Sequence, residues 1–394
     1  MKIIVSILCT LLMAASLQAQ PSISLQEAIA MAMNRYPALK ASRLHTQSTL
    51  AMQRTARDFG NLELSMGGEE IGRGNDAVTT LLAARQNLDI FSVKARWQRL
   101  QQETRVAHAT TRVLEQQLQL QVCSAYAADQ MARLRLELYR KQAELYTRFV
   151  EAARLRYDTR AASLLEYQSA QSEHRRVELN VIEAEKDVEK AHIDLSRWLS
   201  PDTLYQSDTV IVDEQVATSA AMLGAHPAIV LANEKVKLAS DISKEMRANA
   251  LPKLYVELGS QMIGSRLGYW SWSVGVSVPV DMGANKARRQ SALVEIEKAH
   301  TELNDQQWSI DVHNRQLNCD YSKWQRTVEY YRKSALPLAN EQRRNALLSY
   351  REGQIGYLDF IQALKTTMDV EFSYIDAYQK LLETKFNIEY YRNK

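Results

Sequence analysis

The side chains best suited to metal binding or acid–base chemistry are scattered along this chain. The histidines are His45, His108, His174, His192, His226, His300 and His313. No two of them have the i, i+4 spacing of a helical ligand pair, and none clusters with a cysteine. Neither a Walker-type phosphate loop nor a nucleophile-elbow sequence is present. The sequence therefore predicts no catalytic residue, no metal site and no bound cofactor, and hence no enzyme.

The glycines indicate where long helices cannot run. Ten of the 13 glycines fall within residues 60–74 and 259–283, whereas residues 89–200 contain neither glycine nor proline. A tract of that length without helix breakers predicts a long uninterrupted helix. Gly67 and Gly68 suggest a phosphate loop only superficially, because the segment that follows them is predicted to be a strand and not a helix.

Charge and export signals narrow the class of protein. With 49 basic and 46 acidic residues, the net charge of +3 argues against a nucleic-acid partner. Lys2, the apolar run 3–15 and the small residues that end at Ala19 have the pattern of a secretory signal, which we place at residues 1–19. No other stretch approaches the ~20 apolar residues of a transmembrane helix. The mature chain is therefore predicted to be exported without a helical anchor.

Two cysteines, Cys123 and Cys319, remain after removal of the signal. Both lie in predicted long helices, which favours small buried thiols. A disulfide between them in an oxidising compartment is the alternative.

Internal similarity indicates a duplication of about 190 residues. The recurring segments are Tyr36-Pro37-Ala38 with His226-Pro227-Ala228, and Lys94-Ala95-Arg96 with Lys286-Ala287-Arg288. We predict a first repeat over residues 20–199, a linker over 200–221 and a second repeat over 222–394.

Each repeat is predicted to contain a medium helix, two strands, a very long helix, a tight turn and a returning helix. In the first repeat these elements are residues 25–58, 62–70, 78–88, 92–156 and 164–199. In the second repeat they are residues 222–248, 254–263, 270–280, 285–349 and 357–391.

Apolar and small residues alternate most strongly in the predicted strand 270–280. Its apolar positions are Trp270, Trp272, Val274, Val276, Val278 and Val280. A period of two indicates one face in apolar surroundings and one in a small polar space. An ordinary sandwich is one interpretation. The other is a membrane barrel in which these residues face lipid and Tyr255 and Tyr269 join an aromatic girdle, and it is favoured because the neighbouring helices are too long to cover the strands.

Four strands are too few to close a barrel in a membrane. Unpaired backbone groups in lipid cost several kcal/mol each, and the smallest closed membrane barrels have about eight strands. The chain is therefore predicted to associate with copies of itself. Three copies, with twelve strands, would enclose a water-filled lumen.

The predicted helices also need partners. One apolar seam with alternating steps of four and three comprises Val177, Val181, Ala184, Val188, Ala191, Leu195 and Trp198. This heptad pattern indicates coiled-coil packing, and the helix 92–156 would be a rod about 95 Å long. An exported, elongated coiled-coil protein with a structural or adhesive role is the alternative, and a periplasmic adaptor is a less favoured one because it normally has one hairpin and no duplication.

Taken together, these features resemble the TolC-like outer membrane efflux proteins. The turn sequences that carry the resemblance are Arg156-Tyr157 with Leu164-Leu165, and the segment from Tyr350 to Asp359. The resemblance implies an α+β membrane protein in which a long-helix α-barrel is continued by a β-barrel, completed by a homotrimer with four strands per chain. It further implies a place in the outer membrane and periplasm, as a passive conduit that receives substrates from an inner-membrane pump through a periplasmic adaptor.

The resemblance also assigns candidate site residues. The turns that would meet the adaptor include Tyr157, Arg160, Ser163, Tyr350, Gly353 and Gly356. Arg160 stands where the family usually has a glycine, which puts docking at the first turn in doubt. Asp359 and Glu166 would form the periplasmic gate, although Gln362 stands where a second carboxylate is common. The alternative role for both carboxylates is stabilisation of a helix N-terminus.

Overall fold

The computed structural model describes residues 21–69, 79–200, 203–208, 226–263, 266–278 and 282–391. The predicted signal peptide, residues 1–19, lies outside them. The chain divides into two compact units that cut across the predicted repeats. We call Ala38–Leu114 with Met222–Asp311 the sheet unit. The other unit, which we call the turn unit, comprises Met1–Pro37, Glu115–Ala221 and Val312–Lys394.

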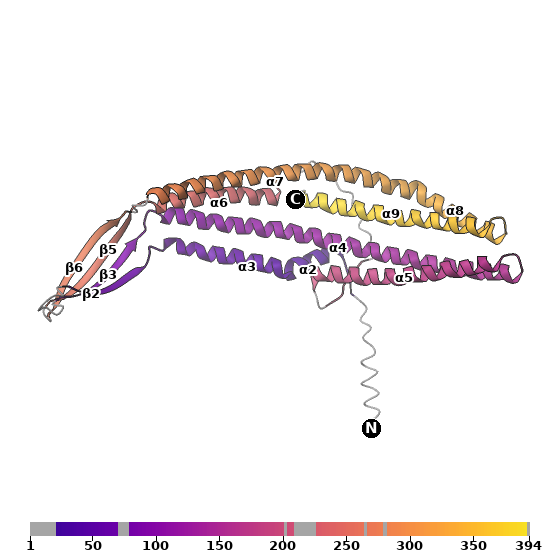
Figure 1. Ribbon diagram of the computed structural model, residues 1–394, viewed down its shortest axis with the longest axis horizontal. Helices are drawn as coiled ribbons and strands as arrows, with labels where there is room; N and C mark the ends of the chain where they lie inside the picture. Colours follow the sequence, from indigo (N-terminus) through magenta and orange to yellow (C-terminus); the bar gives the residue numbers. More distant parts are fainter. Residues whose placement is uncertain are drawn as a thin grey trace, which may run out of the picture. The chain divides into compact units, whose positions relative to one another are not determined.

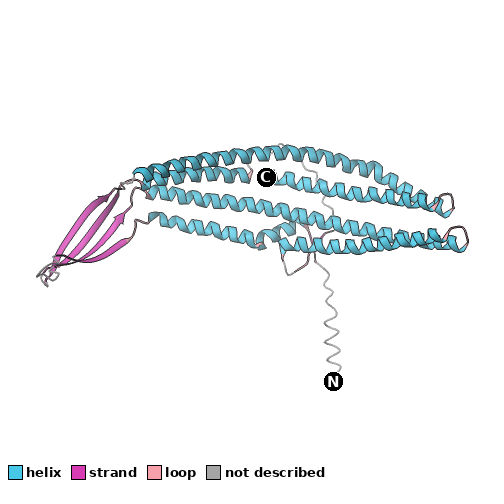
Figure 2. Cartoon of the chain, viewed as in Figure 1, coloured by secondary structure: helices cyan, strands magenta, loops and turns pink. Residues whose placement is uncertain are grey.

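The sheet unit holds the four long strands and the helices that enter and leave them (Figures 1 and 2). Its elements are α3 (Pro37–Met52), η1 (Gln53–Arg57), β2 (Leu62–Glu69), β3 (Thr79–Leu88), the start of α4 (Val93–Asp158), α6 (Pro227–Asn249), β5 (Lys253–Ile263), β6 (Arg266–Ser277) and the first part of α7 (Met282–Tyr330). The strand order is β2-β3-β5-β6, and every neighbouring pair is antiparallel.

The turn unit holds two helical hairpins, each closed by a tight turn (Figure 1). Its elements are β1 (Ser22–Ile23), α2 (Leu25–Arg35), the rest of α4, α5 (Leu164–Leu199), β4 (Gln206–Ser207), the rest of α7, the π-helical turn η3 (Tyr331–Ala335), α8 (Leu336–Arg351) and α9 (Tyr357–Tyr391). The short strands β1 and β4 pair in parallel. The strand β4 therefore lies within the predicted linker.

The predicted helices and strands are confirmed with local corrections. The two returning helices begin and end where predicted, at Leu164–Leu199 and Tyr357–Tyr391. The predicted helix 25–58 is instead broken at Tyr36, which is extended (ψ 120°) because the ring of Pro37 disfavours helical geometry in the residue before it. The predicted helix 285–349 is interrupted by η3 just before Pro337, which has no N–H to donate.

The predicted strand 270–280 also needs correction. The strand β6 begins earlier, at Arg266, and ends at Ser277. Val278 follows the strand, and Val280 lies outside the described residues. None of the described helices combines the length and apolar character needed to cross a membrane.

Candidate functional site

One face of the four-stranded sheet is apolar and exposed. The register places Leu64, Ala84, Leu258 and Trp272 opposite one another on successive strands. Because side chains alternate along a strand, the same face also carries Met66, Leu82, Val256, Val274 and Val276. Trp270 and Trp272 are 79% and 78% exposed. The predicted alternation is therefore confirmed, and it extends across all four strands.

The opposite face is polar and contains small residues. Ser271, Ser273 and Gly275 of β6 lie on it. Tyr255 is paired with Gly275, and Tyr269 with Gln261, so both tyrosines lie on this polar face. The expectation that these two tyrosines join Trp270 and Trp272 in one aromatic girdle is therefore wrong, because they occupy positions of the opposite parity.

The two helical turns have the same backbone geometry. After α4, the Ala161 N–H donates to the Arg156 carbonyl and the Arg160 N–H to the Tyr157 carbonyl. After α8, Gln354 donates to Ser349 and Gly353 to Tyr350 in the same pattern. These paired bonds define the Schellman motif, which needs a left-handed residue after the helix. Arg160 (φ 60°) and Gly353 (φ 74°) are those residues.

Arg160, which stands where the family usually has a glycine, therefore keeps the same turn conformation but with a strained backbone. A non-glycine residue in the left-handed region costs about 1 kcal/mol. We expect Arg160→Gly to raise the free energy of unfolding by up to about 1 kcal/mol, and Gly353→Ala to lower it by a similar amount. Thermal unfolding monitored by circular dichroism measures both. Shifts of the same sign in the two variants would contradict this assignment.

Tyr350 ties the two turns together and does not present its side chain at the surface. It is 1% exposed, and its hydroxyl donates to Oε1 of Glu166 at 2.9 Å. The Arg156 guanidinium lies 4.7 Å from the centre of the Tyr350 ring and donates to the Tyr350 carbonyl at 3.3 Å. Burial, followed by the Glu166 carboxylate, raises the pKa of Tyr350 far above its usual value. Tyr350 therefore acts as a support for the turns.

The two carboxylates predicted for the gate have different environments. Glu166 lies in the first turn of α5, where Ser163 Oγ accepts from its N–H at 3.2 Å, and its side chain accepts from Tyr350. Asp359 lies in the first turn of α9 and is exposed. Glu166 is half-buried, so Asp359 is the more exposed of the two residues.

An aromatic cluster sits beneath the turns. Phe149, Tyr350 and Phe360 are at most 1% exposed. The ring of Phe360 lies 4.8 Å from that of Phe149 and 4.7 Å from that of Tyr350, measured between centroids. The exposed apolar side chains near the turns, which were not predicted as a contact surface, are Leu155, Leu164, Leu165, Leu348 and Leu358. Leu165 and Leu358 are 72% and 77% exposed, so the turns expose apolar as well as polar side chains.

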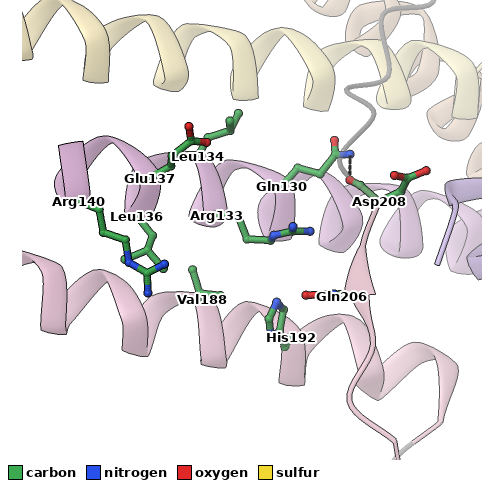
Figure 3. A pocket seen from close by; sticks show the side chains of 10 residues that line it. All are labelled: Gln130, Arg133, Leu134, Leu136, Glu137, Arg140, Val188, His192, Gln206 and Asp208. Carbon is green, nitrogen blue, oxygen red and sulfur yellow. Dashed lines mark hydrogen bonds between the residues drawn. The ribbon is translucent and has the colours of Figure 1, made fainter. Parts of the chain in front are cut away.

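A cavity of about 400 Å³ opens beside β4 in the turn unit (Figure 3). It is lined by Gln130, Arg133, Leu134, Leu136, Glu137, Arg140, Val188, His192, Gln206 and Asp208. At its edge the fully buried Asp129 accepts from the Ser207 N–H at 2.8 Å, and Oδ1 of Asp129 lies 3.2 Å from Nε2 of His192. Arg133 donates to the Ser207 carbonyl. These groups hold β4 against α4.

The sequence reasoning gave Asp129 and His192 no role. The signal that was available is the polar stripe Tyr126, Asp129, Gln130 and Arg133, which recurs at helical spacing within the long helix. All four side chains contact the backbone of residues 206–208 or of Ile23 in the structure.

The two cysteines differ in environment. Both are free thiols in the chain, with Cys123 buried and Cys319 exposed, so burial is confirmed for Cys123 alone. Burial raises the pKa of Cys123 to about 12, which makes it a poor nucleophile. Within the part of the chain that the structure describes, no three His, Cys, Asp or Glu side chains gather as a metal site requires.

Comparisons with known proteins identify the fold. No family model and no curated protein matches the sequence. Among solved structures, one match is CusC, with a TM-score of 0.81 and 17% sequence identity over 94% of this chain and 92% of CusC. The crystal structures of CusC concern folding and transmembrane channel formation. The outer membrane protein VceC from Vibrio cholerae matches with 0.77 at 14% identity, over 93% and 95% of the two chains.

The open state of the MtrE outer membrane channel from Neisseria gonorrhoeae matches with a TM-score of 0.76 at 17% identity, over 93% of this chain and 88% of that one. At these identities the likeness establishes the fold. The resemblance to TolC-like outer membrane proteins that the sequence predicted is therefore confirmed for the fold.

Proposed function

We propose that three copies of this chain form an outer-membrane channel that serves as a passive conduit and catalyses no reaction. The observation that carries the proposal is the exposed apolar face of the sheet, on which Leu64, Met66 and Trp272 are each more than 70% exposed. Water disfavours such a face by roughly 25 cal/mol per Å². Lipid removes this penalty, so the face is suited to the hydrocarbon of a bilayer.

The strand order supports the association of several copies. In the described sheet, β2 and β6 are the outer strands. Their outward backbone groups need hydrogen-bond partners in lipid, where each unpaired group costs several kcal/mol. Pairing β6 of one copy with β2 of the next satisfies both edges. With three copies the barrel has twelve strands, its apolar residues face lipid and its polar face lines the lumen.

The helices have exposed apolar side chains that fit the same assembly. On α7, Leu293, Val294 and Trp308 are 51%, 57% and 73% exposed. Long helices in a ring bury such residues against the neighbouring subunit by coiled-coil packing. The two predicted repeats would then alternate around an α-barrel in the periplasm.

We assign the two turns to docking of a periplasmic adaptor that connects the channel to an inner-membrane pump. The exposed leucines around both turns, with Tyr157, Arg160, Ser163, Gly353 and Gly356, provide the contact surface. The Schellman geometry shared by Arg160 and Gly353 supports docking at both turns, because the backbone is presented in the same way.

The gate is assigned to Asp359 in preference to Glu166, whose carboxylate is already bonded to Tyr350. Three copies of Asp359 around the axis would attract cations, which is an effect that salt screens. In planar bilayers we expect Asp359→Asn to reduce cation selectivity and to weaken block by multivalent cations. Stability should change by no more than about 1 kcal/mol, the contribution of a carboxylate at a helix N-terminus.

Glu352→Gln is the matched control, since Glu352 is another exposed carboxylate of the same turn. It should leave block unchanged. An Asp359→Asn channel with normal block and a lowered melting temperature would show that Asp359 only stabilises its helix. Wild-type protein that forms no conducting pores, or that leaves the membrane fraction without detergent, would favour the structural or adhesive role instead.

A further inference from the structure

Tyr255 lies flat against the backbone of β6 on the polar face of the sheet. Tyr255 and Gly275 are directly opposite each other on β5 and β6. A Cβ atom added to Gly275 would meet Cζ and the hydroxyl oxygen of Tyr255 at 2.2 Å. Gly275 therefore provides the space into which the ring of Tyr255 fits, and any larger residue there would displace the ring.

Arg85 of β3 covers this ring. Its guanidinium carbon lies 3.8 Å from the centroid of Tyr255, which is the geometry of a cation–π contact. Among the described residues, the buried Nε of Arg85 has no hydrogen-bond acceptor. The guanidinium therefore contacts the aromatic ring, and no carboxylate of the described residues accepts from its Nε.

Two carboxylates flank Arg85 in the same row of the sheet. Glu63 on β2 and Glu257 on β5 are directly opposite Arg85, and Ser273 on β6 continues the row. Oε1 of Glu63 accepts from Nδ2 of Asn87 at 3.0 Å, which fixes its position. We call Glu63, Arg85, Glu257 and Ser273 the charged row. It carries two negative charges and one positive charge, so its net charge is −1 per chain.

The next row on the same face is small and uncharged. It consists of Ser65, Ala83, Gly259 and Ser271. The polar face therefore changes abruptly from bulky charged side chains to small ones. A lumen lined by this face would be narrower at the charged row than at this row of small residues.

We propose that the charged row and the Arg85–Tyr255 stack form a collar in the lumen that sets the conductance and favours small cations over anions. This inference rests on the proposed trimeric channel, in which three rows meet around one axis. Three net charges of −1 then sum to −3, because the three guanidinium groups offset half of the charge of the six carboxylates. The collar is separate from Asp359, which belongs to the turn unit.

The test is the reversal potential of single channels in a potassium chloride gradient. Glu257→Gln removes a negative charge, so it should shift the reversal potential towards that of chloride. Arg85→Gln removes the positive charge and should shift it in the opposite direction. Both shifts should shrink in high salt, because nearby ions screen the fixed charges.

A second pair of variants tests the role of the Tyr255 ring without changing any charge. Gly275→Ala should alter the conductance by displacing Tyr255. Gly67→Ala is the control, because an added Cβ there meets nothing within 4 Å. Conducting channels in which Arg85→Gln and Glu257→Gln shift the reversal potential in the same direction, or not at all, would overturn the collar while leaving the channel intact. Absence of conductance in the wild type would overturn the proposed function, and the collar with it.

Discussion

Replacing Val274 by arginine should destabilise the protein in a bilayer by about 2–4 kcal/mol, the cost of a cation on the lipid face near the midplane of a membrane barrel. Val274 lies on the apolar face and is 63% exposed in the single chain. In water, an exposed valine-to-arginine change costs within about 0.5 kcal/mol. The large effect is therefore expected only if this face contacts hydrocarbon.

The cost of arginine should also depend on how far the residue lies from the membrane midplane. Val276 lies next to the end of β6 at Ser277, so Val276→Arg should cost less than Val274→Arg. Denaturant titrations of the protein folded into lipid vesicles measure both values.

Ser273→Arg is the matched control, since Ser273 lies on the polar face opposite Glu257. Gly275 is unsuitable as a control because Tyr255 occupies the space of its side chain. Equal costs for arginine at positions 273 and 274 would show that the apolar face is covered by protein and not by lipid.

Replacing Phe360 by alanine should destabilise the turn unit by about 3–5 kcal/mol, which is typical of a fully buried phenylalanine. Phe360 is 0% exposed and packs on both Phe149 and Tyr350, so its loss leaves a cavity beneath both turns. Hydrogen exchange of the turn amides is the direct measurement, because local opening is faster where packing is lost.

Leu358→Ala, two residues earlier, provides the comparison. Leu358 is 77% exposed, and its removal should leave hydrogen exchange unchanged while weakening capture of an adaptor. Phe360→Ala should weaken capture as well, but through disorder of the turns. Unchanged exchange in Phe360→Ala would contradict the role of the aromatic cluster as the support of the docking surface.

Patterns with a strict period allowed most of the fold to be predicted from the sequence. The alternation in β6 was visible because Trp272, Val274 and Val276 stand between serines and a glycine. The first returning helix was visible because its apolar seam, from Val177 to Trp198, steps regularly by three and four, and the second followed from the internal duplication. Both patterns report which face of an element is apolar, and that is fixed locally by backbone geometry.

Features that depend on tertiary contacts were missed. The stack of Arg85 on Tyr255 joins two strands that are far apart in the chain, so no local sequence pattern predicted it. The left-handed conformation of Arg160 was also hidden, because it is fixed by the Schellman hydrogen bonds and not by residue type. The tie between Tyr350 and Glu166 similarly depends on two turns meeting in space.

The mass of the protein purified in detergent tests the central claim most directly. In the proposed channel, β2 and β6, the outer strands of the described sheet, pair with neighbouring copies, so light scattering corrected for bound detergent should give the mass of three chains. The β-sheet signal in circular dichroism should persist in that assembly and be lost on dissociation. A stable monomer that retains its β-sheet signal would contradict the account, because the sheet would then be complete within one chain.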